Sequence, residues 1–161
     1  MSFKATKVET PKPSRVTAKF QTFEDLEVYK SARQFRKAMY SVQRRLPDFE
    51  NHELASQIRR AAVSLTNNIA EGHGRFHYPD QIRFFLHARG SLEELVDDLN
   101  VCSDESYLRT DEVAPLKEQA RGALLLLNGY LRYLRSRSLS VREDESAYAV
   151  DLETVSDTPS L

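Results

Sequence analysis

A run of small and apolar residues from Leu54 to Gly72 constrains the fold more than any other part of the sequence. Within this run, Ile58, Ala61 and Leu65 recur at spacings of three and four, the period of one face of an α-helix. Small residues flank that face, and Val63 lies nearly opposite it. A helix that is apolar on almost all sides is buried on almost all sides. We therefore expect this helix to contact its own bundle on one side and another chain on the other.

Three further segments show the same period, and each is bounded by residues that start or stop helices. Links of roughly five to eight residues join the four segments, which favours neighbours packed antiparallel. The sequence therefore predicts an all-α fold: an antiparallel up-down-up-down four-helix bundle over residues 23–137, assembling into a homo-oligomer. The predicted helices run from Glu24 or Asp25 to Leu46, from between Asp48 and Glu53 to a C-cap at Gly72, from Pro79 and Asp80 to Cys102, and from Thr110 to about Arg137.

The composition limits the class of protein. A chain of 161 residues has room for one domain of ordinary size, and 40% hydrophobic with 29% charged residues suits a globular protein. No apolar run approaches the ~20 residues of a membrane span, and the N-terminus lacks the apolar core of a secretory signal. We expect a cytoplasmic protein that does not enter membranes. The single cysteine, Cys102, cannot form an internal disulfide and is predicted to be a buried thiol.

The net charge of −1 conceals three unlike segments. Residues 1–22 are predicted to be a disordered basic leader, and residues 138–161, with six acids against Arg142, a disordered acidic tail. Residues 23–137 balance at 17 bases against 17 acids, and 14 of those bases are arginines. Arginine suits both structural ion pairs and phosphate binding, so both interpretations stay open.

Three glycines inside the predicted helices, Gly90, Gly122 and Gly129, support association, because each costs roughly 1 kcal/mol relative to alanine. Gly122 and Gly129 share a stripe that flanks the outward Leu125. Either close packing within one bundle or a neighbouring subunit accounts for them. The residues predicted to lie in an oligomer interface are Val63, Ala70, Gly122, Leu125 and Gly129.

The motifs of common enzymes and metal sites are missing from the sequence. It contains no Glu-x-x-His pair of the di-iron bundles, no glycine-rich phosphate loop and no nucleophile elbow. His73 and His77 have metal-like spacing, but the loop between them removes the helical geometry that would aim both rings at one ion. We predict a protein that is not an enzyme and has no metal and no cofactor.

Charge placement is the remaining functional signal. Bases alternate with tyrosines along one flank of the first helix, and further arginines gather at one end of an alternating bundle. This pattern is typical of a surface that follows phosphates and stacks bases, although a solvated helix face looks almost the same. The predicted nucleic-acid-binding residues are Arg33, Arg36, Lys37, Tyr40, Arg44, Arg75, Arg83, Arg132, Arg135 and Arg137.

Polar residues of the second and third helices have two interpretations. They could bind a ligand, or they could satisfy one another across helices, with Arg89 and Glu93 forming an i, i+4 pair. The structural use is the more common one. The residues of this predicted polar network are Arg60, Asn67, Asn68, Glu71, Arg89 and Glu93.

The string QIRRAAVSLTNNIAEGHGR, with FEDLEVYKSAR before it and FFLHARGSLEEL after it, resembles the family of ribosomal RNA intervening-sequence proteins. That family includes the accessory variability determinant proteins of diversity-generating retroelements. The resemblance spans about Phe23 to Arg135. It implies an up-down bundle assembled into a ring, typically a homopentamer, without catalytic activity. In the retroelement branch it also implies binding to RNA or DNA and to a reverse transcriptase.

Overall fold

The computed structural model describes residues 22–155. Over that range the chain is all-α, with four α-helices, two single-turn 3-10 helices and no strand. The predicted leader, except for Thr22, and residues 156–161 of the predicted tail lie outside the described residues. The elements are η1 (Phe23–Asp25), α1 (Glu27–Gln43), η2 (Asp48–Glu50), α2 (Leu54–His73), α3 (Tyr78–Asp104) and α4 (Thr110–Val155).

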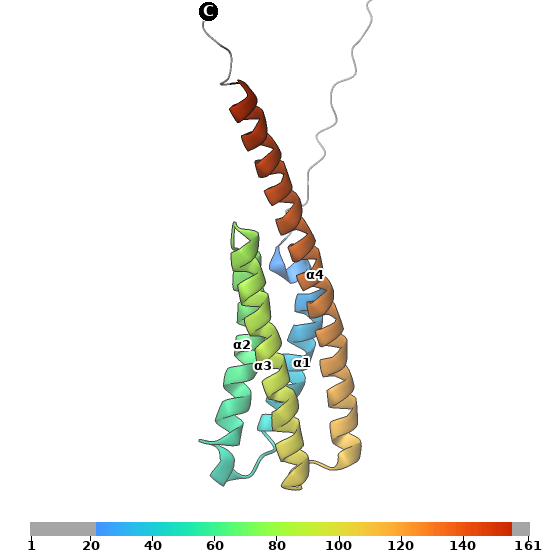
Figure 1. Ribbon diagram of the computed structural model, residues 1–161. Coiled ribbons are helices and arrows are strands. Elements are labelled where there is room, and N and C mark those ends of the chain that lie inside the picture. Colours follow the sequence, from blue (N-terminus) through green and yellow to red (C-terminus); the bar gives the residue numbers. More distant parts are fainter. Residues whose placement is uncertain (1–21, 156–161) are drawn as a thin grey trace, which may run out of the picture.

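The four helices pack side by side around a shared core. Helix α1 packs against α2 and α4, and α3 packs against the same two helices from the other side. Figure 1 shows the α2–α3 link at one end of the bundle and the other two links at the opposite end. Helix α4 continues beyond the α2–α3 end, away from the other helices.

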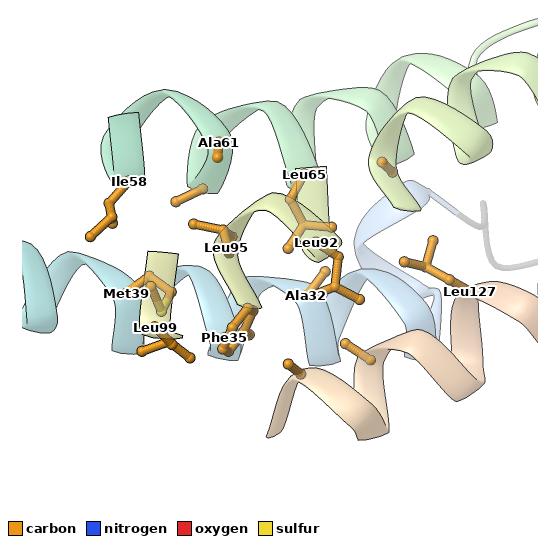
Figure 2. Close-up of a cluster of buried hydrophobic side chains, with 14 of the residues drawn as sticks. Ala32, Phe35, Met39, Ile58, Ala61, Leu65, Leu92, Leu95, Leu99 and Leu127 are labelled. Carbon is orange, nitrogen blue, oxygen red and sulfur yellow. The ribbon is translucent and has the colours of Figure 1, made fainter. Parts of the chain in front are cut away.

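The apolar residues with helical spacing fill the core. Side chains from all four helices meet in its centre, including Phe35 and Met39 of α1, Leu65 of α2, Leu95 of α3 and Leu127 of α4 (Figure 2). All five have no exposed surface. Burying one such side chain contributes about 1.5 to 3 kcal/mol, so the seams account for the packing of the helices. Cys102 is buried, as the sequence predicts.

The first helix starts later and ends earlier than its sequence predicts. Thr22 and Asp25 form a capping box around η1, so the acidic residues expected to open α1 belong to this separate turn. Helix α1 then begins at Glu27 and ends at Gln43, three residues before Leu46. Leu46 is still buried, in a turn that follows α1 directly and in which Leu46 N donates to the carbonyl oxygen of Gln43.

Gly72 was predicted to be the C-cap of the second helix, and that prediction is wrong. Helix α2 continues through His73, and Gly74 occupies the C-cap position. Gly72 is instead buried against α3, where an added Cβ would lie 2.9 Å from Cδ2 of Phe85. The glycine serves close helix packing, not chain reversal.

The last helix extends beyond the residues that show apolar three- and four-residue spacing. Helix α4 continues to Val155, whereas the sequence predicts its end near Arg137. Residues 138–155 contain neither glycine nor proline, so no residue type that breaks helices interrupts the backbone there. The predicted acidic tail therefore overlaps the projecting end of α4.

Candidate nucleic-acid interface and association surface

A basic groove runs between α1 and α2. It consists of two adjoining hollows of about 570 Å³ each, and both are lined by Tyr40 of α1 and Val63 of α2. We call this surface the α1/α2 groove. Its other lining residues are Arg36, Lys37, Ser41, Arg44, Arg59, Arg60, Ser64, Asn67, Asn68 and Glu71.

Helical register brings the α1 side of the groove together. Arg36, Tyr40 and Arg44 follow one another at four-residue spacing and so share one face of the helix. Arg36 donates from Nη1 to the buried hydroxyl of Thr66 at 2.8 Å, which ties this face to α2. Of the α1 flank predicted from sequence, Arg36, Lys37, Tyr40 and Arg44 line the groove, whereas Arg33 does not.

The arginines of the groove are held by neutral partners. Arg59 donates to the carbonyl oxygen of Asn51 at 3.1 Å, and Arg60 donates to Oγ of Ser56 at 3.3 Å. Within the described part of the chain, none of the five basic residues lining the groove forms an ion pair. The acid that lines it, Glu71, is paired with Arg75. The groove thus carries excess positive charge.

The remaining residues predicted to bind nucleic acid do not line the groove. Arg33 is exposed on α1, and Arg132, Arg135 and Arg137 are exposed on α4. Arg75 and Arg83 lie near the α2–α3 link, with their guanidinium carbons 4.7 and 5.3 Å from the centre of the Phe84 ring.

Part of this second basic cluster is already neutralised. Arg75 is paired with Glu71, and Arg83 lies 3.6 Å from Asp80. Both arginines also stack on Phe84, an interaction that holds their charged heads in place. The α1/α2 groove is consequently the stronger candidate site for an anion.

The structure does not join the predicted polar network into one unit. Asn68 donates to the carbonyl and hydroxyl oxygens of Ser64, at 2.8 and 3.0 Å, and Ser91 of α3 donates to that same hydroxyl at 2.8 Å. Arg89 and Glu93 are exposed, and no ion pair joins them among the described residues, so the expected i, i+4 pair is not formed. Arg60, Asn67, Asn68 and Glu71 instead line the groove.

An apolar hollow of about 300 Å³ lies between α1 and α4. Leu125 is 58% exposed and Tyr133 is 52% exposed, and both line the same hollow, so their apolar surface is contiguous. We call this surface the α1/α4 face. It is lined by Leu26, Glu27, Val28, Leu125, Leu126, Gly129, Tyr130 and Tyr133.

The predicted interface residues fall on two separate surfaces. Leu125 and Gly129 line the α1/α4 face, whereas Val63 lies in the α1/α2 groove and is only half-buried. Ala70 is also half-buried on α2. An added Cβ at Gly122 or Gly129 would meet no atom within 4 Å, so packing inside this bundle requires neither glycine.

The third helix contains a buried carboxyl group that the sequence patterns do not predict. Asp98 of α3 is 2% exposed, and its Oδ1 accepts a hydrogen bond of 2.9 Å from Nε2 of Gln57, while Oδ2 has no partner. Burial, followed by the charges of Glu94 and Asp97, raises the pKa of Asp98 to about 6. Burial also raises the pKa of the nearby Cys102 thiol to about 11, so this thiol is poorly reactive.

His73 and His77 do not belong to a metal-binding group. Among the described residues, no three or more histidine, cysteine, aspartate or glutamate side chains are placed to hold a metal ion. Over the same residues, every helix is too short or too polar to cross a membrane.

The sequence match to a known family agrees with this fold. The family model of the 23S rRNA-intervening sequence proteins matches residues 24–129. The chain belongs to this family. The family match covers α1, α2, α3 and the first part of α4, including every residue of the α1/α2 groove. No enzymatic activity is known for 23S rRNA-intervening sequence proteins. No curated protein matches the chain.

Proposed function

We propose that the protein is a non-enzymatic, cytoplasmic scaffold or adaptor that works as a ring-like homo-oligomer of up-down-up-down bundles. The observation that carries this proposal is the α1/α4 face, an apolar hollow built around an exposed leucine. Contiguous apolar surface of this kind marks interaction sites on globular proteins. A ring of five subunits is the assembly that the family resemblance implies.

The glycines beside Leu125 support the same proposal. Each lies within a helix, where glycine is less favourable than alanine by about 1 kcal/mol. The space around Gly122 and Gly129 is open, so the bundle itself offers no compensation. Close contact with a second chain at these positions would offset the lower helix propensity of the two glycines.

The arrangement of the links supports the up-down topology. Successive links lie at alternate ends of the bundle in Figure 1. Contacts between α1 and α4 close the bundle, so both helices contribute to one outer face. When such a face binds a different face of the next copy, the repeated rotation generates a closed ring or an open filament.

The mass of the full chain in solution tests this proposal. We expect multi-angle light scattering at micromolar concentration to give a multiple of 18.5 kDa that changes little on tenfold dilution. A mass of 18.5 kDa across that range would disprove the assembly and with it the scaffold role.

A second function is favoured by the α1/α2 groove. Its five bases, without acidic partners, and the partly exposed ring of Tyr40 are the chemistry that follows a phosphate backbone and stacks a base. The protein would then bind RNA or DNA, as an accessory partner of a reverse transcriptase in a diversity-generating retroelement. A gene position beside a reverse transcriptase gene, and retention of RNA that weakens steeply with salt, are the expected results. RNA retention that does not change with salt would exclude the groove as the binding site.

A further inference from the structure

The α1/α2 groove lacks acidic partners within its own bundle. Arg36, Arg44, Arg59 and Arg60 bond only to hydroxyl or carbonyl oxygens among the described residues. Such partners orient the guanidinium groups but leave their charge, and a cluster of like charges attracts an anion. The occupant should therefore be a segment that carries several acidic residues.

The chain itself contains an acidic segment of that kind. Residues 143–161 hold no lysine or arginine, although the chain as a whole is close to neutral. Residues 1–142 therefore carry all 23 lysines and arginines against 18 of the 24 acids. The acids of the segment are Glu143, Asp144, Glu145, Asp151, Glu153 and Asp157.

The path of α4 keeps this segment away from the groove of its own chain. Helix α4 packs against α1 and α3, and it leaves the bundle past the α2–α3 link (Figure 1). At 1.5 Å per residue, Val155 lies about 27 Å beyond Arg137 along the helix axis.

We infer that the acidic segment 143–161 of one chain occupies the α1/α2 groove of a second copy of the same chain. Charge complementarity selects the groove, and the direction of α4 makes the contact intermolecular. The contact uses neither Leu125 nor the rest of the α1/α4 face, so it is independent of the proposed scaffold interface. Because the contact is an attraction between opposite charges, it weakens as salt shortens the range of that attraction.

Carbodiimide cross-linking of the full chain tests this inference. The reagent joins a carboxylate to an amine without a spacer, and Lys37 is the lysine that lines the groove. We expect peptides that link Lys37 to Glu143, Asp144 or Glu145 in the dimer band of a denaturing gel. The yield should fall at least threefold between 50 and 500 mM salt.

Matched variants distinguish specific binding at the groove from nonspecific attraction to exposed positive charge. Arg44→Gln with Arg60→Gln should reduce the Lys37 links at least threefold. Arg121→Gln with Arg132→Gln, which changes two exposed arginines outside the groove, should leave the yield unchanged. Unfolding curves of both double variants confirm that the bundle is intact.

The other outcomes of the experiment overturn the inference. Links from the acidic segment to Lys37 in the monomer band would show contact within one chain. Links to Lys4, Lys7, Lys12 or Lys19 in place of Lys37 would show pairing with the basic leader. Equal links to the exposed Lys30, or no links at all, would show that the groove does not bind the segment. Light scattering of the same samples reports the scaffold assembly separately.

Discussion

Gly72 of α2 lies directly against Phe85 of α3, with room for a hydrogen atom but not for a methyl group. A Cβ at Gly72 would lie 2.9 Å from Cδ2 of Phe85 and 3.0 Å from Cβ of Phe84. Phe85 has no exposed surface, and its ring stacks on Tyr130 with 4.5 Å between centroids. It therefore cannot move aside, and the close approach of α2 and α3 depends on this glycine.

We predict that Gly72→Ala destabilises the bundle by up to about 2 kcal/mol. Overpacking costs about 1 to 3 kcal/mol and outweighs the gain in helix propensity of about 1 kcal/mol. Urea unfolding followed by circular dichroism measures the difference. Gly90→Ala is the control, because a Cβ at Gly90 meets nothing within 4 Å, and it should stabilise the protein by about 0.5 to 1 kcal/mol. A stabilised Gly72→Ala variant would contradict this account.

Gly122→Ala and Gly129→Ala should weaken self-association although alanine favours the helix. Added methyl groups find open space within the chain, so the bundle itself loses nothing. A second chain that packs directly against the helix backbone at these glycines would clash with the added methyl groups. Sedimentation velocity should show at least a tenfold loss of affinity for the double variant and none for Gly90→Ala. Unchanged association of the double variant would remove these glycines from the interface.

Periodicity predicts the core well and its contacts poorly. The three- and four-residue spacings place residues such as Phe35 and Leu95 inside, because the helical period decides which face of a helix is apolar. The role of Gly72 is not predictable in this way, since a C-cap and a close helix contact both require glycine near a helix end. Only the position of Phe85 distinguishes them.

Only the part of the candidate site that lies on a single helix is predictable from the sequence. Arg36, Lys37, Tyr40 and Arg44 lie on one flank of a single helix, so their spacing is enough to group them. Arg59 and Arg60 belong to another helix, and their place in the groove depends on how α1 and α2 pack. The predicted arginine–glutamate pair on α3 is absent because proximity at i, i+4 on an exposed face stabilises a pair only weakly.

The buried carboxyl group of Asp98 should make stability depend on pH. Its pKa is raised to about 6 in the folded state, so the folded state binds the proton more tightly than the unfolded state does. Stability is therefore lost as the pH rises from about 4 to about 6, by about 2 kcal/mol. Asp98→Asn, which mimics the protonated acid, should lack this loss.

Urea unfolding at pH 4.5 and at pH 7.5, at a fixed protein concentration, measures the effect of Asp98. The stability of Asp98→Asn relative to the wild type should increase by about 2 kcal/mol between these two pH values. The exposed Asp104→Asn is the control and should change far less. An equal response of the two variants would show that Asp98 is not the group responsible.

Charge reversal in the α1/α2 groove should weaken RNA binding more than charge reversal near the α2–α3 link. Lys37→Glu, Arg44→Glu and Arg60→Glu together remove three cations that have no acidic partner. We expect at least a tenfold weaker affinity at low salt and a shallower salt dependence, because fewer counterions are released. Filter binding with a single-stranded RNA measures both.

The control for the groove is the triple variant Arg75→Glu, Arg83→Glu and Arg135→Glu. Arg75 and Arg83 already have acidic partners, so this variant should lose less affinity than the groove variant. The reverse order would place the binding site at the α2–α3 end of the bundle.

Self-association through the α1/α4 face is tested most directly by comparing two leucines of the same helix. Leu125 lies in that face and is 58% exposed, whereas Leu139 is 59% exposed and lies outside it. Light scattering of Leu125→Gln and Leu139→Gln at equal micromolar concentration measures the mass of each variant. The account predicts 18.5 kDa for Leu125→Gln and the wild-type multiple for Leu139→Gln. An unchanged multiple for Leu125→Gln would contradict it.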